Sequence, residues 1–447
     1  MANASVQIDW SGGGTAQAVA AARRALQSGG KSVHQTPKFQ AAPVSAPCPV
    51  EAAAVAIAPA AVPARSIRLT SFGVARSVAG RPSLYALMTL AIIGIGLAGV
   101  LKANVAFAPE MYNDNGMVPA AVAQAKGKNY AVFDLNLNIR RWKEELVSRL
   151  DYTPDLVVIG ASQWQEAHAG LVKSERMFNG HIHRDYWEDL LANIEVYVRN
   201  NKLPKRMIIA IRDKQFTPIA LRKDFLWEPG IPNYRSMADR LGIQKEDAWK
   251  TYPYQRMKEK LSLSMLFNNV TRWYNSEERP QETSERHFQH LDTLLPDGSI
   301  LWSADHMAVF TRERMKREVQ ALADVARVNP PVVDTKGVEA FDTLLGFLQE
   351  NGVQVILAQP PFNPLFYDAV QGSEYVAGLD NIRKITRDLA AKHRLHIIGE
   401  FDPAKVGCTV DQYIDAEHSS PPCLQRIFDQ YEALLPQLRL ETKKGQL

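Results

Sequence analysis

An uncharged run of twenty residues constrains this chain more than any other feature of its sequence. The run extends from Pro82 to Leu101. At about 1.5 Å per residue, a helix of this length matches the roughly 30 Å hydrocarbon core of a bilayer. Four arginines between residues 65 and 81 precede the run, and only Lys102 follows it closely. The positive-inside rule therefore predicts a transmembrane helix over 82–104, with the N-terminal arm in the cytoplasm and the remainder outside.

A cleaved signal peptide is the alternative interpretation of this run. The small residues of Ala106-Phe-Ala108 resemble a cleavage site. However, Pro109 follows directly, and the arm that precedes the run is far longer than the charged start of a signal peptide. A retained anchor is therefore favoured, and with either interpretation the rest of the chain is exported.

The first 80 residues have the composition of a disordered cytoplasmic arm. Prolines scattered through a tract of small residues prevent a continuous helix and supply little apolar bulk for a core. Residues 1–82 hold eight Lys and Arg against Asp9 and Glu51, a balance of +6, and the whole chain carries +4. The remainder is thus close to −2, so the basic character lies in the arm and does not indicate nucleic-acid binding by the exported part.

Residues 105–447 are predicted to form one exported α/β domain, because from about residue 130 helical and strand patterns alternate. Such alternation is typical of a mostly parallel sheet with helices on both faces. From about 217 to 335 the alternation lapses, and this region is predicted to be a helical insertion or lid. The expected helices cover 138–150, 184–200, 337–352, 375–393 and 421–438, and the expected strands 155–159, 206–211, 353–358 and 395–399.

A serine stands at the end of the first of these strands. The continuous apolar run Leu156–Ile159 is typical of a parallel strand buried on both faces. Gly160 and Ala161 then remove side-chain bulk, and Ser162 follows at the carboxyl end, where open α/β sheets bind ligands. Ser162 is therefore a candidate nucleophile. The alternative is a serine that only caps the next helix.

A second polar group lies more than 250 residues downstream. Asp415 and His418 are three residues apart, just before Pro421 and the last predicted helix. In a tight turn, this spacing lets both side chains reach one site, where the imidazole acts as general base and the carboxylate orients it. Together with Ser162 they would make a Ser-His-Asp triad.

Two cysteines flank this pair. Cys408 and Cys423 enclose fourteen residues that include both Asp415 and His418. In an oxidising compartment they would form a disulfide that constrains the loop. Two unpaired buried thiols are the alternative. Cys48 lies in the arm, and the absence of a Cys-x-x-Cys motif gives no indication of a redox enzyme.

The Ile-Gly-Ala-Ser162 and Asp415-Ala-Glu-His418 motifs resemble those of the SGNH/GDSL hydrolase superfamily. In layout the resemblance covers roughly residues 130–440 and implies a flavodoxin-like, three-layer α/β fold. It is greatest to the membrane-anchored acyl-transfer branch, which includes the anchored protein of lipoteichoic-acid D-alanylation and the periplasmic alginate acetylation proteins.

This resemblance implies a serine O-acyltransferase or esterase at the bacterial inner membrane, with its domain in the periplasm and no cofactor. The substrate would be an envelope or secreted polysaccharide. A membrane-bound O-acyltransferase or a polysaccharide synthesis or secretion complex would be the partner. A catalytically lapsed binding or scaffold subunit and a tethered esterase are the alternatives.

The chain also departs from the pattern of that superfamily. The family's oxyanion hole combines the serine N–H, a glycine N–H and an asparagine, for which the candidates here are Ser162 and Gly180. Where the asparagine belongs, the chain has Arg212 and Asp213. The missing donor argues against fast hydrolysis of simple esters and fits a slower, partner-assisted transfer or a non-catalytic domain.

Other histidines receive no role from the sequence. His181 and His183 have the i, i+2 spacing of a two-ligand zinc arrangement on a strand, but no third ligand accompanies them at a convincing spacing. They are therefore predicted to line the site, with no metal bound. His168 and the Asp305-His306 pair are interpreted as ordinary surface or core residues.

Overall fold

The computed structural model describes residues 84–107, 117–133, 138–173, 175–183, 185–218, 230–243, 261–275 and 280–444. The predicted arm over 1–80 lies outside these ranges. Of the helices within them, only α2 (Leu84–Phe107) is long and apolar enough to cross a membrane. Its window Leu87–Asn104 has a mean hydropathy of 1.7 and is 6% buried. Helix α2 therefore gives weak support for a single membrane anchor.

The part of the chain after α2 contains a parallel sheet, so the predicted α/β class is confirmed. Its order is β3-β2-β4-β8-β9, and every neighbouring pair is parallel. Parallel neighbours require a crossover between them, which explains the helices on the faces. The strands are β2 (Leu156–Ile159), β3 (Met177–Asn179), β4 (Arg206–Ala210), β8 (Gln354–Gln359) and β9 (His396–Gly399).

Strand β2 lies inside this sheet and is the strand that the apolar run predicts. All four of its residues are buried. Val157 pairs with Phe178 of β3 on one side and with Met207 of β4 on the other. The prediction of a strand covered on both faces is confirmed, because an uninterrupted apolar run suits only a strand without a solvent-facing side.

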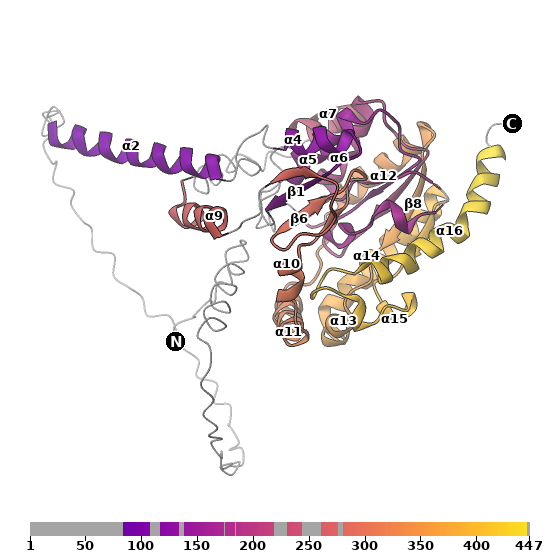
Figure 1. Ribbon diagram of the computed structural model, residues 1–447. Helices are drawn as coiled ribbons and strands as arrows, with labels where there is room; N and C mark the ends of the chain where they lie inside the picture. The colour runs from indigo at the N-terminus through magenta and orange to yellow at the C-terminus, as the bar shows by residue number, and fades with distance from the viewer. Residues whose placement is uncertain are drawn as a thin grey trace, which may run out of the picture. The chain divides into compact units, whose positions relative to one another are not determined.

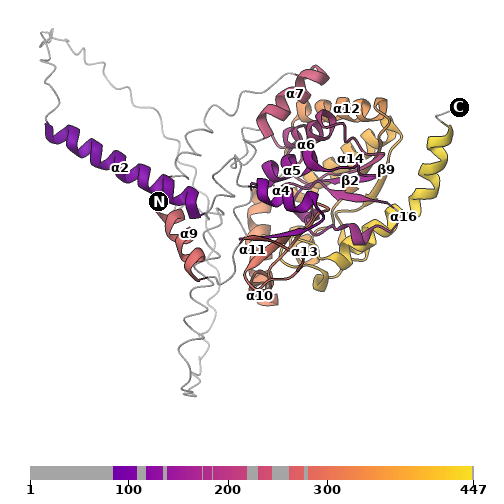
Figure 2. The same ribbon diagram turned by 45° about the horizontal axis from the view of Figure 1, so that its top comes forward.

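Helices cover both faces of the parallel sheet (Figures 1 and 2). On one face α6 packs against α12 and α12 against α14, whereas α16 contacts β9 and the short helix η2 (Ala169–Leu171). The crossovers that follow β3, β4 and β8 thus share one face. The larger helices are α5 (Ile139–Arg149), α6 (Trp187–Arg199), α12 (Thr335–Glu350), α14 (Glu374–His393) and α16 (Pro421–Lys444), and shorter ones are α4 (Val118–Ala125), α7 (Ile231–Leu241), α13 (Pro364–Val370) and α15 (Pro403–Val406).

Helix α12 shows how local sequence sets the ends of these helices. The Asp334 carboxylate accepts the N–H of Lys336 at 3.1 Å and caps the start. The helix ends at Glu350, and Gly352 then adopts a φ of +76°, which glycine reaches without strain. The Asn351-Gly352 stop signal therefore predicts this end correctly.

The region 217–335 is only partly the helical insertion that its sequence predicts. Its described residues include helices but also three strands, which form an antiparallel sheet with β1 (Asn129–Phe133) in the order β5-β1-β6-β7. Short strands with partners far away in sequence give little local periodicity, which explains why they were not predicted. The elements are α7, α9 (Leu263–Asn275), β5 (Gln281–Thr283), β6 (Leu291–Leu294), β7 (Ile300–Leu301), α10 (Ala304–Val309) and α11 (Arg312–Val328).

The turn between β6 and β7 joins the two sheets. The carbonyl of Asp297 accepts the N–H of Asn179 at 2.6 Å, and the N–H of Ile300 donates to Gln165 at 2.9 Å. Gly298 has a φ of +83°, and a Cβ there would lie 2.4 Å from the carbonyl oxygen of Asn179. A glycine is therefore required at this approach, which places β7 beside the loop that follows Ser162.

A single large apolar core lies between the parallel sheet and its helices. Closely packed interiors of this kind resist any added volume. The largest fully buried aromatic side chains are Trp142, Trp164, Phe178, Tyr197, Phe216, Tyr234, Phe341, Phe366, Phe401, Phe428 and Tyr431.

Gly160 and Gly346 offer a matched pair of glycine substitutions. A Cβ at Gly160 would lie 2.7 Å from the Cβ of Ala210, whereas at Gly346, inside α12, the nearest atom would lie at 3.9 Å. We expect Gly160→Ala to lower the free energy of unfolding by about 2 kcal/mol through overpacking. Gly346→Ala should raise it by about 0.5–1 kcal/mol through helix propensity. Denaturant unfolding of the two purified variants measures both, and equal effects would contradict this packing.

Candidate active site

Ser162 lies at the carboxyl end of β2 and begins the short helix η1 (Ser162–Trp164). Ala161 before it is extended, with φ −78° and ψ −176°, so the chain turns at the serine. Gly160 leaves no side chain between β2 and the Trp164 ring, from which a Cβ would be only 3.1 Å away. The small residues before Ser162 therefore let the chain turn sharply against its neighbours.

Asp415 and His418 lie in a tight turn that their own backbone closes. Tyr413 and Ser419 form an isolated antiparallel bridge, and the N–H of Ile414 donates to the carbonyl of His418 at 2.9 Å. Within the turn, one oxygen of the Asp415 carboxylate accepts the N–H groups of Glu417 and His418, each at 2.7 Å. A carboxylate fixed in this way holds its second oxygen in a defined direction.

The structure brings the three predicted residues together. The second oxygen of Asp415 lies 2.7 Å from Nδ1 of His418, and Nε2 of the same ring lies 2.9 Å from Oγ of Ser162. Because a carboxylate only accepts hydrogen bonds, Nδ1 carries the proton and donates it to Asp415. The neutral ring then presents Nε2 as an acceptor for the serine hydroxyl. This is the geometry of a Ser-His-Asp triad.

The electrostatics of the pair favour an imidazole that gains a proton readily. Burial lowers the pKa of His418, but the Asp415 carboxylate and its hydrogen bond outweigh burial and raise it above the usual value. Burial raises the pKa of Asp415, whereas the His418 ring and the two N–H groups lower it below its usual range. Asp415 therefore stays ionised and stabilises the imidazolium that forms when Ser162 loses its proton.

The loop after β8 holds the Asp415–His418 turn through hydrogen bonds. The amide of Asn363 donates to the carbonyl of Asp415 at 3.0 Å. The hydroxyl of Tyr413 contacts the carbonyls of Pro361 and Phe362 at 3.0 and 2.7 Å. Because Gln359 ends β8, these contacts tie the turn to the carboxyl edge of the sheet, the edge at which Ser162 also lies.

The cysteines on either side of the turn form a disulfide. Cys408 and Cys423 are joined, with their Cα atoms 5.3 Å apart and a sequence separation of 15. Cys423 begins the buried face of α16, and Cys408 follows α15. The bond therefore closes the loop that carries both Asp415 and His418 and limits its freedom in the unfolded chain.

The backbone N–H of Gly180, a candidate oxyanion donor, is already occupied. It donates to the carbonyl of Val158 at 2.7 Å and continues the pairing of β3 with β2. A Cβ at Gly180 would lie 2.5 Å from the hydroxyl of Tyr197, so close packing explains this glycine. A role for Gly180 in an oxyanion hole would require this hydrogen bond to be given up. For Ser162, by contrast, the described residues include no acceptor for its backbone N–H.

Arg212 and Asp213 occupy the end of β4, the place where the superfamily resembled by the sequence has an asparagine. Asp213 accepts the hydroxyl of Tyr375 at 2.6 Å, which makes it a buried structural acceptor. Nε of Arg212 lies 3.7 Å from the Asp213 carboxylate. Burial lowers the pKa of Arg212, but the charges of Asp213, Tyr186 and Glu417 outweigh burial and raise this pKa overall.

The histidines at 181 and 183 do not belong to a metal-binding group in the part of the chain that the structure describes. The His181 ring is fully buried, and its Nδ1 lies 3.0 Å from the side-chain oxygen of Asn179. Asn179 donates its amide to the carbonyls of Trp164 and Ala167, which fixes its oxygen toward His181. His181 therefore carries its proton on Nδ1, and Asn179 ties β3 to the loop after Ser162.

Three residues near the triad were not predicted from the sequence. The Trp302 ring meets the His418 ring edge-on, with centroids 5.3 Å apart, and stacks on His306 at 4.3 Å. Glu166, four residues after Ser162, interacts electrostatically with His418 and His306. The i, i+4 spacing of Trp302 and His306 across the start of α10 is a sequence signal for a shared face, but it does not reveal the contact with His418.

The sequence matches no protein-family model and no curated protein.

Removal of the disulfide should weaken the turn that holds His418. Replacement of Cys408 and Cys423 by serine should lower the free energy of unfolding by about 3 kcal/mol, since the bond closes a loop of this length. Cys48→Ser, which leaves the bond intact, is the control and should have no effect. Denaturant unfolding of the purified chains measures the difference, and an unchanged midpoint in the double variant would show that the bond does not stabilise the fold.

The pH dependence of serine reactivity should report the Asp415–His418 pair. Only a neutral His418 accepts the serine proton, so the reaction with a fluorophosphonate should rise with pH through a midpoint above 6.5, the usual value. In Asp415→Asn the midpoint should move down, because the carboxylate no longer stabilises the imidazolium. The limiting rate should fall by about ten-thousand-fold. Stopped-time labelling across pH measures both quantities, and a midpoint that stays fixed in Asp415→Asn would contradict this pairing.

Proposed function

We propose that this chain is a membrane-anchored, SGNH-type serine enzyme that adds acyl groups to, or removes them from, an envelope or secreted polysaccharide. The single observation that carries the proposal is the hydrogen-bonded chain from Ser162 through His418 to Asp415. Ser162 lies 253 positions before Asp415 in the sequence, so local structure alone does not bring these residues together. Such an arrangement activates a serine for attack on an acyl carbonyl.

The chemistry assigns one role to each residue. Oγ of Ser162 attacks the acyl carbonyl of a donor while Nε2 of His418 takes the hydroxyl proton. The bond to the leaving group breaks, His418 returns the proton to that group, and an ester on Ser162 remains. A hydroxyl of the acceptor, or water, then attacks this ester as His418 takes its proton. The bond to Oγ breaks, and the proton passes back to Ser162. Asp415 orients the ring throughout.

The topology supports the resemblance to SGNH proteins. Numbered within the sheet, the strand order β3-β2-β4-β8-β9 is 2-1-3-4-5, the order of flavodoxin-like folds. Ser162 follows the first strand of that sheet, and Asp415 and His418 precede the last helix, α16. The carboxyl edge of a sheet with this order is where such folds bind ligands.

The sequence around α2 supports a periplasmic location of the domain. Arginines precede the helix and the disulfide follows it, as expected for a cytoplasmic N-terminus and an exported, oxidising C-terminal side. An enzyme anchored beside the inner membrane is well placed to receive acyl groups from a membrane-bound O-acyltransferase. It would act on glycan as a synthesis or secretion complex exports it.

One observation favours a second candidate, a binding or scaffold subunit without catalysis. The N–H of Gly180 is occupied by Val158, and no asparagine stands at the end of β4. A site with few oxyanion donors stabilises a tetrahedral intermediate poorly. A tethered esterase, the third candidate, requires turnover of simple esters without any partner protein.

Replacement of Ser162 separates these candidates. An activated serine should react with a fluorophosphonate probe, and Ser162→Ala should lose this labelling and reduce acyl transfer by roughly a thousandfold or more. Ser148→Ala is the control, because the hydroxyl of Ser148 donates to the carbonyl of Glu145 and accepts from Arg149, both within α5. Mass spectrometry of labelled peptides gives the site.

The outcomes distinguish the three functions. Labelling at Ser162 together with slow turnover of p-nitrophenyl esters supports the acyl-transfer enzyme. Fast turnover of the same esters by the purified chain alone indicates the tethered esterase. If the wild-type chain is not labelled at Ser162, the catalytic proposal fails and the binding subunit remains.

A further inference from the structure

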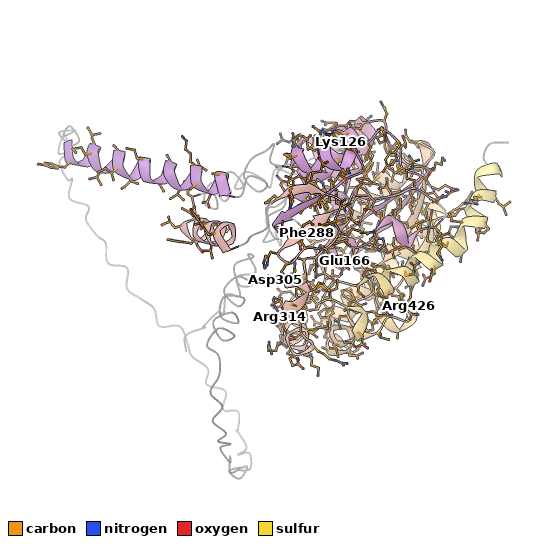
Figure 3. The ribbon with its side chains drawn as sticks, in the orientation of Figure 1. Lys126, Glu166, Phe288, Asp305, Arg314 and Arg426 are labelled. Atoms are coloured by element: carbon orange, nitrogen blue, oxygen red, sulfur yellow. A yellow bond between two sulfur atoms is a disulfide. The ribbon has the colours of Figure 1, made fainter. Side chains whose placement is uncertain are left out.

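The Glu166 carboxyl is buried beside the triad and has no structural partner. The residue is 7% exposed, and within the described part of the chain its side chain makes no hydrogen bond or ion pair. Its electrostatic neighbours are His418, Asp292, His306 and Asp415. Because burial without a partner is costly for a carboxyl group, a structural role does not explain Glu166. The group is labelled in Figure 3.

Burial changes the ionisation of this carboxyl. Burial raises the pKa of Glu166 to about 7, an effect that His418 and His306 partly oppose and that Asp292 and Asp415 reinforce. Near neutral pH the group therefore exists in both forms and can donate or accept a hydrogen bond. A group with both capacities suits a hydroxyl partner, which also donates and accepts.

An aromatic cluster of Trp302, His306 and Phe310 follows β7, whose Ile300 N–H donates to the carbonyl of Gln165, the neighbour of Glu166, at 2.9 Å. Trp302 and His306 are parallel, with an interplanar angle of 2°, and Phe310 lies 5.2 Å from His306 and 5.5 Å from Trp302. All three residues are partly exposed. The edge-on contact of Trp302 with His418 connects this cluster to the triad. Aromatic surface beside polar groups is characteristic of sites that bind small polar ligands.

Local hydrogen bonds hold the cluster in place. Asp292 of β6 accepts the N–H of Ser303 at 2.7 Å, and the hydroxyl of Ser303 accepts the N–H of His306 at 3.2 Å, which caps α10. The short helix thus presents His306 toward Asp292, whose carboxylate lies 3.8 Å from Nδ1 of the ring. The antiparallel sheet therefore delivers one side of the site.

The charges around the site are mainly negative. Glu166, Asp292 and Asp415 are buried carboxyl groups, and Glu417 is exposed beside His418. The guanidinium of Arg212 lies 3.7 Å from the Asp213 carboxylate and interacts with the charge of Glu417, so its own charge is already matched. Like charges close together repel, so this surface opposes an anionic ligand and tolerates a neutral one.

We propose that Glu166, Trp302 and His306 form an acceptor subsite for a sugar unit that carries no negative charge. The inference rests on the proposed function, since it names the substrate class of the same site. A sugar hydroxyl would exchange hydrogen bonds with the Glu166 carboxyl, and the C–H faces of the ring would pack against the aromatic cluster. The bound hydroxyl then lies close to His418, the base that must take its proton.

Oligosaccharide binding tests this subsite without any need for catalysis. The full chain carrying Ser162→Ala, in detergent, is titrated calorimetrically with cellohexaose and chitohexaose as neutral probes and with hexagalacturonate as the anionic probe. We expect a neutral probe to bind at least about tenfold more tightly than hexagalacturonate, because the carboxyl groups around the triad repel an anionic ligand.

Variants assign the effect to the proposed residues. Glu166→Gln keeps the shape but exchanges one carboxyl oxygen for an amide NH2 that only donates, and it should weaken the neutral probe about tenfold. Trp302→Ala should weaken it by a similar factor. Trp302→Phe, which retains an aromatic ring, should recover most of the affinity. Glu339→Gln, an exposed carboxyl on α12, is the control and should bind as the parent does.

The results separate this inference from the proposed function. Tighter or equal binding of hexagalacturonate, no binding of either neutral probe, or unchanged affinity in both Glu166→Gln and Trp302→Ala would overturn the subsite. Fluorophosphonate labelling of Ser162 in the wild-type chain, measured in parallel, reports the proposed function alone. A chain that is labelled yet prefers the anionic probe would support the proposed function and contradict the subsite. An unlabelled chain that binds a neutral sugar would contradict the proposed function and support the subsite.

Discussion

The Asp415 carboxylate is the point on which the candidate site depends. One of its oxygens accepts two backbone N–H groups from its own turn, and the other accepts the His418 ring. A carboxylate with three hydrogen bonds remains ionised in a buried position and fixes the tautomer of the imidazole. Without that constraint His418 would rotate, and Nε2 would no longer face Ser162. The disulfide and the Asn363 amide hold the turn against the rest of the fold.

Two separate architectures meet beside the triad. The parallel sheet supplies Ser162 from the end of β2, and the antiparallel sheet supplies Trp302 and His306 from β7 and α10. The junction is the β6–β7 turn, where Gly298 permits an approach that any larger residue would block. In our proposal the first architecture carries the chemistry of acyl transfer and the second determines which acceptor reaches it.

The sequence predicts those parts of the fold that local pattern determines. The apolar run of β2, the stop signal of α12 and the cysteine spacing lead correctly to a buried parallel strand, a helix end and a disulfide. The triad is predicted from two short motifs, because a serine at the end of a strand and an Asp-x-x-His pair before the last helix are the residue types that acyl transfer requires. The antiparallel sheet was not predicted, since β1 pairs with strands about 150 residues away and each strand is short. The surroundings of Glu166 depend on how the antiparallel sheet packs, so no sequence pattern predicts that its carboxyl lacks a hydrogen-bond partner.

The most direct test of the central claim is a crystal structure of the chain after reaction with diisopropyl fluorophosphate. Our account predicts a covalent bond from phosphorus to Oγ of Ser162, with Nε2 of His418 within hydrogen-bonding distance of the adduct and Asp415 still bound to Nδ1. The phosphoryl oxygen would also reveal the donors that replace the missing asparagine. An unmodified Ser162, or an adduct on another residue, would contradict the assignment of this triad.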